Sequence, residues 1–154
     1  CELEATGGVE FFEGLGFSPF VPLTSDPLEL RKKLEAHRLK VSQLDVSFPI
    51  NRWECIDFIR RGIIFAGLLG VPFVDTTDGK YKVPGMSDRE QIDRIIYHLS
   101  QCLPVAENHK VVINVEPHGP YTNNGDFMER LFEHFESEYL PPWRQANDKE
   151  NEAR

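Results

Sequence analysis

Four short apolar runs along the chain are typical of β-strands, and each is followed by a longer segment with apolar residues at helical spacing. The expected strands are residues 1–5, 40–47, 71–76 and 110–116. Strict alternation of strand and helix indicates parallel strands joined by right-handed crossovers. The pattern therefore predicts an α/β fold.

The expected helices begin with Asp, Asn or Ser followed three residues later by Glu, a common pattern at helix N-termini. These pairs are Asp26 with Glu29, Asn51 with Glu54, Ser87 with Glu90, and Asp126 with Glu129. Pro27 at the first helical position favours the first helix, and Gly70 can close the second. Pro104 is expected to kink or end the third helix before Ala106.

Four strand and helix units leave open whether the sheet closes into a barrel. An eight-stranded (β/α) barrel takes roughly 250 residues, so four units would form about half of one. An open doubly wound sheet is the structural alternative, but it normally has a Gly-rich phosphate loop after an early strand, and we find none. We expect a (β/α)8 TIM-barrel type present as roughly a half barrel.

The run at residues 110–116 has the clearest alternation. One face carries Val111, Ile113 and Val115, and the other carries Val112, Asn114 and Glu116. The apolar face can take a covering helix, while Glu116 points the opposite way, toward the barrel interior, at the strand end where barrel enzymes place their chemistry. Glu116 is therefore a candidate catalytic carboxylate; its alternative role is to cap a loop.

Composition and charge narrow the class of partner. The net charge of −8 repels phosphate backbones and argues against a nucleic-acid partner, whereas a small polar or metal-bound substrate fits. No apolar run approaches the ~20 residues that cross a bilayer, so we expect no membrane partner. Cys1, Cys55 and Cys102 are widely spaced, without a C-x-x-C pair, which indicates reduced thiols and a cytoplasmic location. The histidines near the helices are expected at the surface: His37, His98, His109 and His134.

The pattern stops after Leu140. Residues 141–154 have almost no apolar side chains and no periodicity, and we expect a disordered or divergent tail. Residues 1–140 are then the partial barrel domain. Because the chain opens with Cys1 inside an expected strand, we expect it to be truncated.

Three segments resemble the xylose isomerase-like TIM barrel superfamily, and in particular its sugar phosphate isomerase/epimerase members. They read V-D-T-T-D-G at 74–79, I-I-F-A-G-L-L-G at 63–70 and N-V-E-P-H-G at 114–119. Their order implies that residues 1 to about 140 are the second through fifth strand and helix units of an eight-unit barrel.

The resemblance assigns a role to Glu116. In that family a Glu at the end of the fifth strand is a ligand of a divalent metal (Mn, Mg or Zn) and often a proton-transfer group. The other ligands, an acidic residue, a His and a second Glu, typically come from later strands. Where the sixth strand is expected, this chain has Pro141, Pro142 and Trp143, so the resemblance implies an incomplete ligand set.

Further site candidates lie at the strand ends. His118 is a second catalytic candidate because it can hydrogen-bond a substrate hydroxyl or a metal-bound water. Glu4, Asp75, Asp78 and Tyr121 are candidate substrate-binding residues. For Asp78 an Asp-Gly turn is the better explanation.

The resemblance implies a metal-dependent isomerase or epimerase that acts on a sugar or sugar phosphate and moves a proton next to a carbonyl. Truncation implies impaired activity or none. A sugar dehydratase or lyase would use the same Glu and metal, so this alternative stays open. The acidic charge disfavours an apurinic-site endonuclease on the same barrel. A non-enzyme alternative is a binding or oligomerising fragment that pairs through its open sheet edges, giving a homo-oligomer.

Overall fold

The computed structural model describes residues 1–6 and 20–141, and the expected tail therefore lies almost entirely outside the described residues. The strands are β1 (Glu2–Thr6), β2 (Phe20–Pro22), β3 (Gln43–Asp45), β4 (Phe73–Thr76) and β5 (Val112–Val115). The helices are α2 (Pro27–Ala36), α3 (Cys55–Leu69), α4 (Asp88–His109) and α5 (Gly125–Phe132). The strands form one parallel sheet in the order β2-β1-β3-β4-β5, which confirms the α/β class.

The four expected strands are present, but β2 was not predicted. It has only three residues, and it pairs with β1 at the edge of the sheet, with Glu4 opposite Phe20. Its last residue is Pro22, which a strand accepts at an edge because no partner needs its missing N–H. So short a run has no alternation that distinguishes it from a loop.

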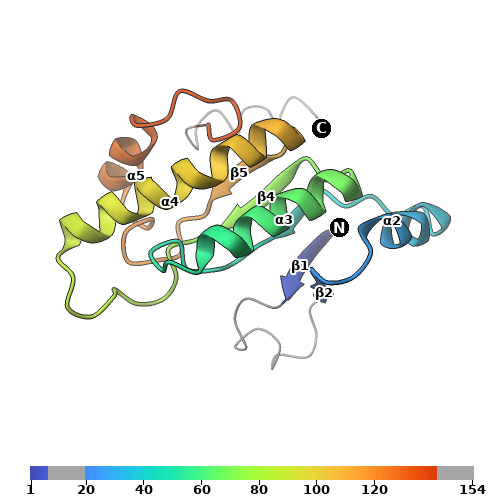
Figure 1. The fold of residues 1–154 in the computed structure, drawn as a ribbon, viewed down its shortest axis with the longest axis horizontal. Coiled ribbons are helices and arrows are strands. Elements are labelled where there is room, and N and C mark those ends of the chain that lie inside the picture. Colours follow the sequence, from blue (N-terminus) through green and yellow to red (C-terminus); the bar gives the residue numbers. More distant parts are fainter. Residues whose placement is uncertain (7–19, 142–154) are drawn as a thin grey trace.

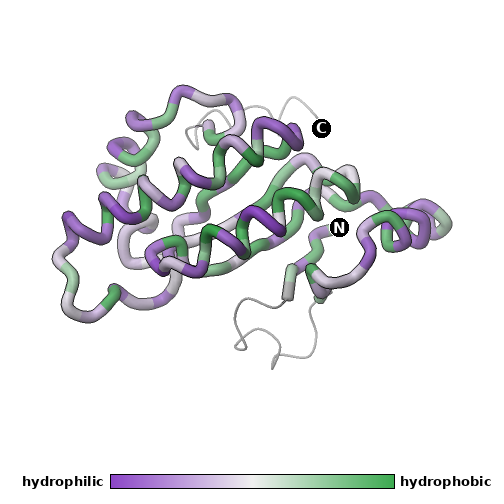
Figure 2. The backbone as a smooth tube through the Cα atoms, in the orientation of Figure 1, coloured by the Kyte–Doolittle hydropathy of each residue, from purple (hydrophilic) through white to green (hydrophobic). Residues whose placement is uncertain are grey.

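One face of the sheet is covered by helices. Figure 1 shows α3 and α4 side by side across the sheet, with α5 beyond the β5 side. Ile63 of α3 and Leu99 of α4 are fully buried against Val74 and Ile113 of the strands. Figure 2 shows hydrophobic and hydrophilic segments alternating along both helices, as expected of helices that pack one side against a sheet. α3 and α4 leave the opposite face of the sheet uncovered, and this face corresponds to the interior of a barrel.

The predicted helix starts are right in two cases. Asp26 caps α2 by accepting the N–H of Leu28 at 2.8 Å, and Pro27 follows it. Ser87 caps α4 in a capping box with Glu90. Gly70 ends α3 with a left-handed φ of 85°, as expected.

Two other predicted starts are wrong. Asn51 is buried in a turn, where its side chain donates to the Tyr81 carbonyl, and α3 begins only at Cys55. Asn124, not Asp126, caps α5 by accepting the Phe127 N–H at 3.2 Å. Asn51 is held by a hydrogen bond to a residue distant in the sequence, and Asn124 takes the cap position ahead of Asp126. The local sequence pattern reveals neither arrangement.

Pro104 does not end α4 as one of the two predicted effects required, because the helix continues to His109. Pro104 lies on the exposed side of the helix, while Leu99, Cys102 and Ala106 are fully buried on the other. Packing of the buried side therefore outweighs the single backbone hydrogen bond that proline removes.

His98 is buried, contrary to the expectation of a surface position. Its Nδ1 lies 2.7 Å from the Ile50 carbonyl oxygen and 3.3 Å from Cys55 Sγ, between α3 and α4. Burial lowers its pKa. Cys1, Cys55 and Cys102 are all free thiols.

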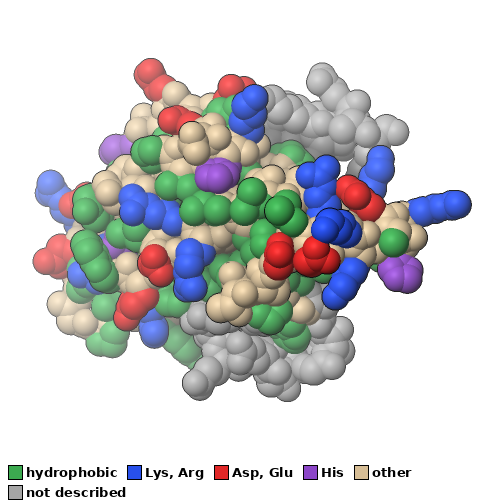
Figure 3. Space-filling model, turned by 45° about the vertical axis from the view of Figure 1, so that its right-hand side comes forward, with side chains coloured by type: hydrophobic (Ala, Val, Ile, Leu, Met, Phe, Trp, Pro, Cys, Tyr) green, Lys and Arg blue, Asp and Glu red, His purple; other side chains and the backbone are tan. Residues whose placement is uncertain are grey.

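The helical side of the molecule is mixed in character. Figure 3 shows Lys and Arg interspersed with Asp and Glu, with hydrophobic side chains exposed between them. Ile64 and Leu68, four residues apart on α3, are exposed hydrophobic side chains. Among the described residues, no helix has the length and apolar character needed to cross a bilayer.

The capping box of α4 leads to a stability prediction. Replacing Ser87 by alanine should lower the free energy of unfolding by about 1 kcal/mol, because the Glu90 N–H loses its acceptor. Urea denaturation monitored by circular dichroism measures the change. Ser100→Ala in the same helix is the control, since Ser100 only donates to the Tyr97 carbonyl one turn back. Equal effects of the two substitutions would contradict the capping role.

Candidate active site

A polar row crosses four neighbouring strands on the face opposite α3 and α4. The strand registers align Glu4 with Asp45, Asp45 with Asp75, and Asp75 with Asn114. Residues aligned in a parallel sheet point to the same face, and their strands lie about 4.8 Å apart. Three carboxylates and one amide therefore lie next to one another on the interior face.

Asp75 is at the centre of this row and is only 2% exposed. Burial raises its pKa to about 7, Asn114 lowers it through a side-chain hydrogen bond, and the charges of Glu116, Asp45 and Glu2 raise it. Oδ2 of Asp75 is buried without a hydrogen-bond partner among the described residues. Asp75 is thus a carboxylic acid that is partly protonated near neutral pH.

Glu116 follows β5 at the C-terminal edge of the sheet, held there by its N–H, which donates to the Thr76 carbonyl at 2.8 Å. Its Oε2 lies 3.4 Å from Nε2 of His118. Burial raises the pKa of Glu116, His118 opposes the rise, and the charges of Asp45 and Glu2 add to it. A half-buried carboxylate with a raised pKa beside an imidazole is suited to proton transfer.

A cavity of about 530 Å³ adjoins the row. Its lining includes Gln43, Phe73, Asp75, Asn114 and Glu116 from the sheet side, and Met128 and Phe132 from α5. This volume is in the range of small-molecule sites, and the lining combines apolar side chains with a few polar groups.

The raised pKa of Asp75 predicts a pH dependence of stability. Between about pH 4 and about pH 7 the folded chain holds a proton on Asp75 that the unfolded chain releases. The contribution of Asp75 to the free energy of unfolding is therefore full below pH 4 and is lost as the pH rises through 7. Asp75→Asn should therefore reduce the fall in unfolding free energy between pH 4.5 and 7.5. Urea denaturation at the two pH values tests this. An unchanged fall would contradict the raised pKa of Asp75. Part of the fall should persist in the variant, because Asp45 and Glu116, whose pKa values are also raised, remain in it.

Asp78 is placed differently from the row. It is fully buried, and its carboxylate accepts the Tyr121 N–H at 2.7 Å and the Thr122 hydroxyl at 2.6 Å. The Thr122 hydroxyl oxygen in turn accepts the Gly119 N–H at 3.0 Å. Asp78 therefore fixes the loop that follows Glu116 and His118.

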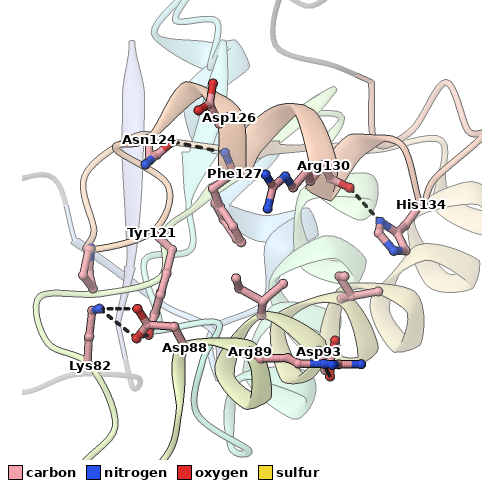
Figure 4. Close-up of a pocket in the computed structure, with 13 residues that line it drawn as sticks. Lys82, Asp88, Arg89, Asp93, Tyr121, Asn124, Asp126, Phe127, Arg130 and His134 are labelled. Carbon is pink, nitrogen blue, oxygen red and sulfur yellow. Dashed lines mark hydrogen bonds and ion pairs between the residues drawn. The ribbon is translucent and has the colours of Figure 1, made fainter.

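Tyr121 lines a different cavity from Asp75 and Glu116. Its hydroxyl donates to Asp88 at 2.8 Å, and Lys82 lies 5.0 Å from its ring centroid. Burial and Asp88 raise its pKa. Figure 4 shows Tyr121 beside the Lys82–Asp88 pair in a second cavity, of about 670 Å³, with Arg130 of α5 across from them.

The structure thus brings Glu4, Asp75, Glu116 and His118 to the interior side, while Tyr121 lines a separate cavity. Asp45 and Asn114 were not among the sequence candidates, although strand alternation places both with the polar interior positions. Identifying them required the register between strands. Among the described residues, no three His, Cys, Asp or Glu side chains are placed to hold a metal ion.

A row of carboxylates at the C-terminal edge of a parallel sheet with outer helices is the layout of a barrel enzyme site. The model of the xylose isomerase-like TIM barrel family matches residues 3–141. The chain belongs to this family. No curated protein has a sequence that matches the chain significantly.

Solved structures share the fold of this xylose isomerase-like chain. L-ribulose 3-epimerase has a TM-score of 0.64 at 16% identity, over 90% of this chain and 57% of that one. Mannonate dehydratase from Streptococcus suis serotype 2 has a TM-score of 0.63 at 17% identity, over 77% and 51%. The IOLI protein, solved with a zinc atom, has a TM-score of 0.57 at 17% identity, over 71% and 42%. The chain spans about half the length of these proteins, consistent with a partial barrel.

Proposed function

We propose that the chain carries part of the active site of a sugar or sugar phosphate isomerase or epimerase. The observation that supports this most directly is Glu116, half-buried at the end of β5, beside a row of carboxylates and a cavity of about 530 Å³. Proteins that share the fold include an L-ribulose 3-epimerase.

The proposed chemistry is proton transfer next to a carbonyl. Glu116 takes the proton from the carbon beside the carbonyl, and the C–H electron pair moves toward the carbonyl oxygen. In an isomerase Glu116 returns the proton to the neighbouring carbon; in an epimerase a second carboxylate on the opposite face donates a proton to the same carbon, and Glu116 keeps the one that it took. The raised pKa of Glu116 makes it a stronger base than an exposed carboxylate. Asp75, with a pKa of about 7, can supply a proton to the oxygen that gains charge.

The other candidates have supporting roles in this proposal. Glu4, half-buried on β1, and Asp75 would accept hydrogen bonds from sugar hydroxyls, and His118 would set the charge state of Glu116. Asp78 would act by holding the loop, and Tyr121 by connecting that loop to Asp88.

A divalent metal (Mn, Mg or Zn) would polarise the carbonyl when bound, and we propose Glu116 as one of its ligands. The zinc in the IOLI protein supports metal use within the fold. The described residues do not fit a complete site, since Glu116 and His118 supply at most two ligands. The steps above therefore use protein groups alone.

We further propose that residues 1–140 are a partial barrel domain, that the 154-residue chain in isolation turns over little or no sugar, and that it acts in the cytoplasm. The edge at β2 favours a homo-oligomer, because no strand among the described residues pairs with its outer side. The outer edge of β5 is partly satisfied, since the Ile113 N–H donates to the Tyr139 carbonyl at 2.8 Å. A purely binding or oligomerising role is the non-enzyme alternative.

A dehydratase is a second candidate, supported by the fold of mannonate dehydratase. It would use the same carboxylate to remove the proton and then lose hydroxide from the adjacent carbon. Glu116 alone does not distinguish the two reactions.

An assay of a sugar panel distinguishes these functions. The longest reading frame that contains this chain and the 154-residue chain itself are each incubated with free and phosphorylated aldoses and ketoses. Epimer or isomer formation supports the leading proposal, and water loss without epimer formation supports the dehydratase. Absence of either reaction in both proteins, with folding verified by circular dichroism, would leave the binding role.

A further inference from the structure

Asp45 and Asp75 lie side by side on the interior face. The proposed proton transfer does not require the two of them together. They are aligned partners in neighbouring parallel strands, and the Val46 N–H donates to the Asp75 carbonyl at 2.8 Å. The residues before them, Leu44 and Val74, are fully buried on the helical side. Both carboxylates therefore project from the interior face, one strand spacing apart.

Each carboxylate accepts a hydrogen bond from a neighbouring residue and also has one buried oxygen without a donor. Ser47 hydrogen-bonds Asp45, and Asn114 hydrogen-bonds Asp75. Among the described residues, no donor lies within hydrogen-bond distance of Oδ1 of Asp45 or Oδ2 of Asp75. Buried polar atoms in proteins are rarely left without a partner, so two neighbouring acceptors point to a ligand with two neighbouring donors.

The surroundings favour an uncharged donor. The charges that act on Asp75 come from Glu116, Asp45 and Glu2, all acidic. On Asp45 the charge of Glu2 is opposed by His118, which is the one basic group that acts on the pair. None of the side chains that line the adjacent cavity is Lys, Arg or His. A phosphate brought to this face would meet the negative charges of the neighbouring acidic groups, and that of Asp75 in its ionised fraction, in a poorly solvated setting where like charges repel strongly. Hydroxyl groups donate to carboxylates without that repulsion.

We propose that Asp45 and Asp75 form a subsite for two adjacent hydroxyl groups of an uncharged sugar, so that this face binds free sugars in preference to sugar phosphates. This inference rests on the proposed function, since it names the substrate class of the same site. A cation is the less suitable ligand, because the described residues offer no group of three ligands for it.

Binding to the 154-residue chain tests the subsite. Amide ¹H–¹⁵N spectra are recorded while D-fructose, D-ribulose or D-xylose is added, and again with the corresponding monophosphates. We expect at least one free sugar to shift the amides around Asp45, Asp75 and Asn114, with affinity at least tenfold higher than that of its phosphate. Asp45→Ala and Asp75→Ala should each weaken that binding about tenfold, and Asp93→Ala, on the exposed surface of α4, should not.

Several results would overturn the subsite. These are phosphates that bind as tightly as free sugars, binding unchanged by both alanine variants that keep dispersed spectra, no response to any of the three sugars, or larger shifts of the same amides with Mg²⁺ alone. Failure of the proposed function looks different: sugar would bind at Asp45 and Asp75 without proton transfer at Glu116. Turnover restricted to phosphorylated sugars would remove the subsite and leave the proposed function intact.

Discussion

Replacing Gly119 by alanine is expected to destabilise the fold by about 3–5 kcal/mol, through overlap and the loss of buried hydrogen bonds. A Cβ at this position would overlap the Asp78 carboxylate and lie 2.6 Å from the Gly79 carbonyl oxygen. Asp78 cannot swing aside at low cost, because it is fully buried and accepts hydrogen bonds from Tyr121 and Thr122.

Equilibrium urea denaturation of Gly119→Ala measures this effect. Gly125→Ala is the matched control, because no atom lies within 4 Å of a Cβ built there. The control should change the free energy of unfolding by about 0.5 kcal/mol or less. A stable Gly119→Ala protein would mean that the loop after Glu116 is not held against Asp78 as described.

Replacing Glu116 by glutamine is expected to lower turnover at least about 100-fold, the usual contribution of a positioned general base. The amide keeps the shape of the side chain but cannot take a proton. Stability at neutral pH should not fall, because burial already raises the pKa of Glu116 and disfavours its charged form. The assay uses the longest reading frame that contains the chain, with the sugar that it converts.

Glu133→Gln provides the control, since Glu133 is exposed just after α5. It should retain full turnover. A Glu116→Gln protein that keeps its turnover would exclude Glu116 as the base, and one that loses turnover together with its thermal transition would indicate a structural role instead.

The sequence predicted the strands and their two faces well where burial of one face makes apolar and polar residues alternate. At residues 110–116 the alternation separated Val111, Ile113 and Val115, all buried, from the interior positions. The prediction failed where tertiary contacts decide. β2 is too short to show a period, and α4 continues through Pro104 because its opposite side is packed in the core.

The candidate site was only partly predictable for a related reason. Glu116 is recognisable from its own strand, because a carboxylate follows an alternating run at a strand end. The row formed by Asp45, Asp75 and Asn114 depends on the register between three strands, which no local pattern determines. Asp78 and Gly119 lie about forty positions apart in the sequence, so their contact is likewise visible only in the fold.

Solvent-deuterium exchange tests the central claim, that Glu116 removes a proton next to a sugar carbonyl, most directly. The longest reading frame that contains this chain is incubated with its sugar in D₂O, and ¹H NMR follows the signal of the carbon-bound hydrogen beside the carbonyl. We predict that this signal is lost with the wild-type protein and persists with Glu116→Gln. Equal loss with both proteins, or conversion of the sugar without any exchange at that carbon, would contradict the account.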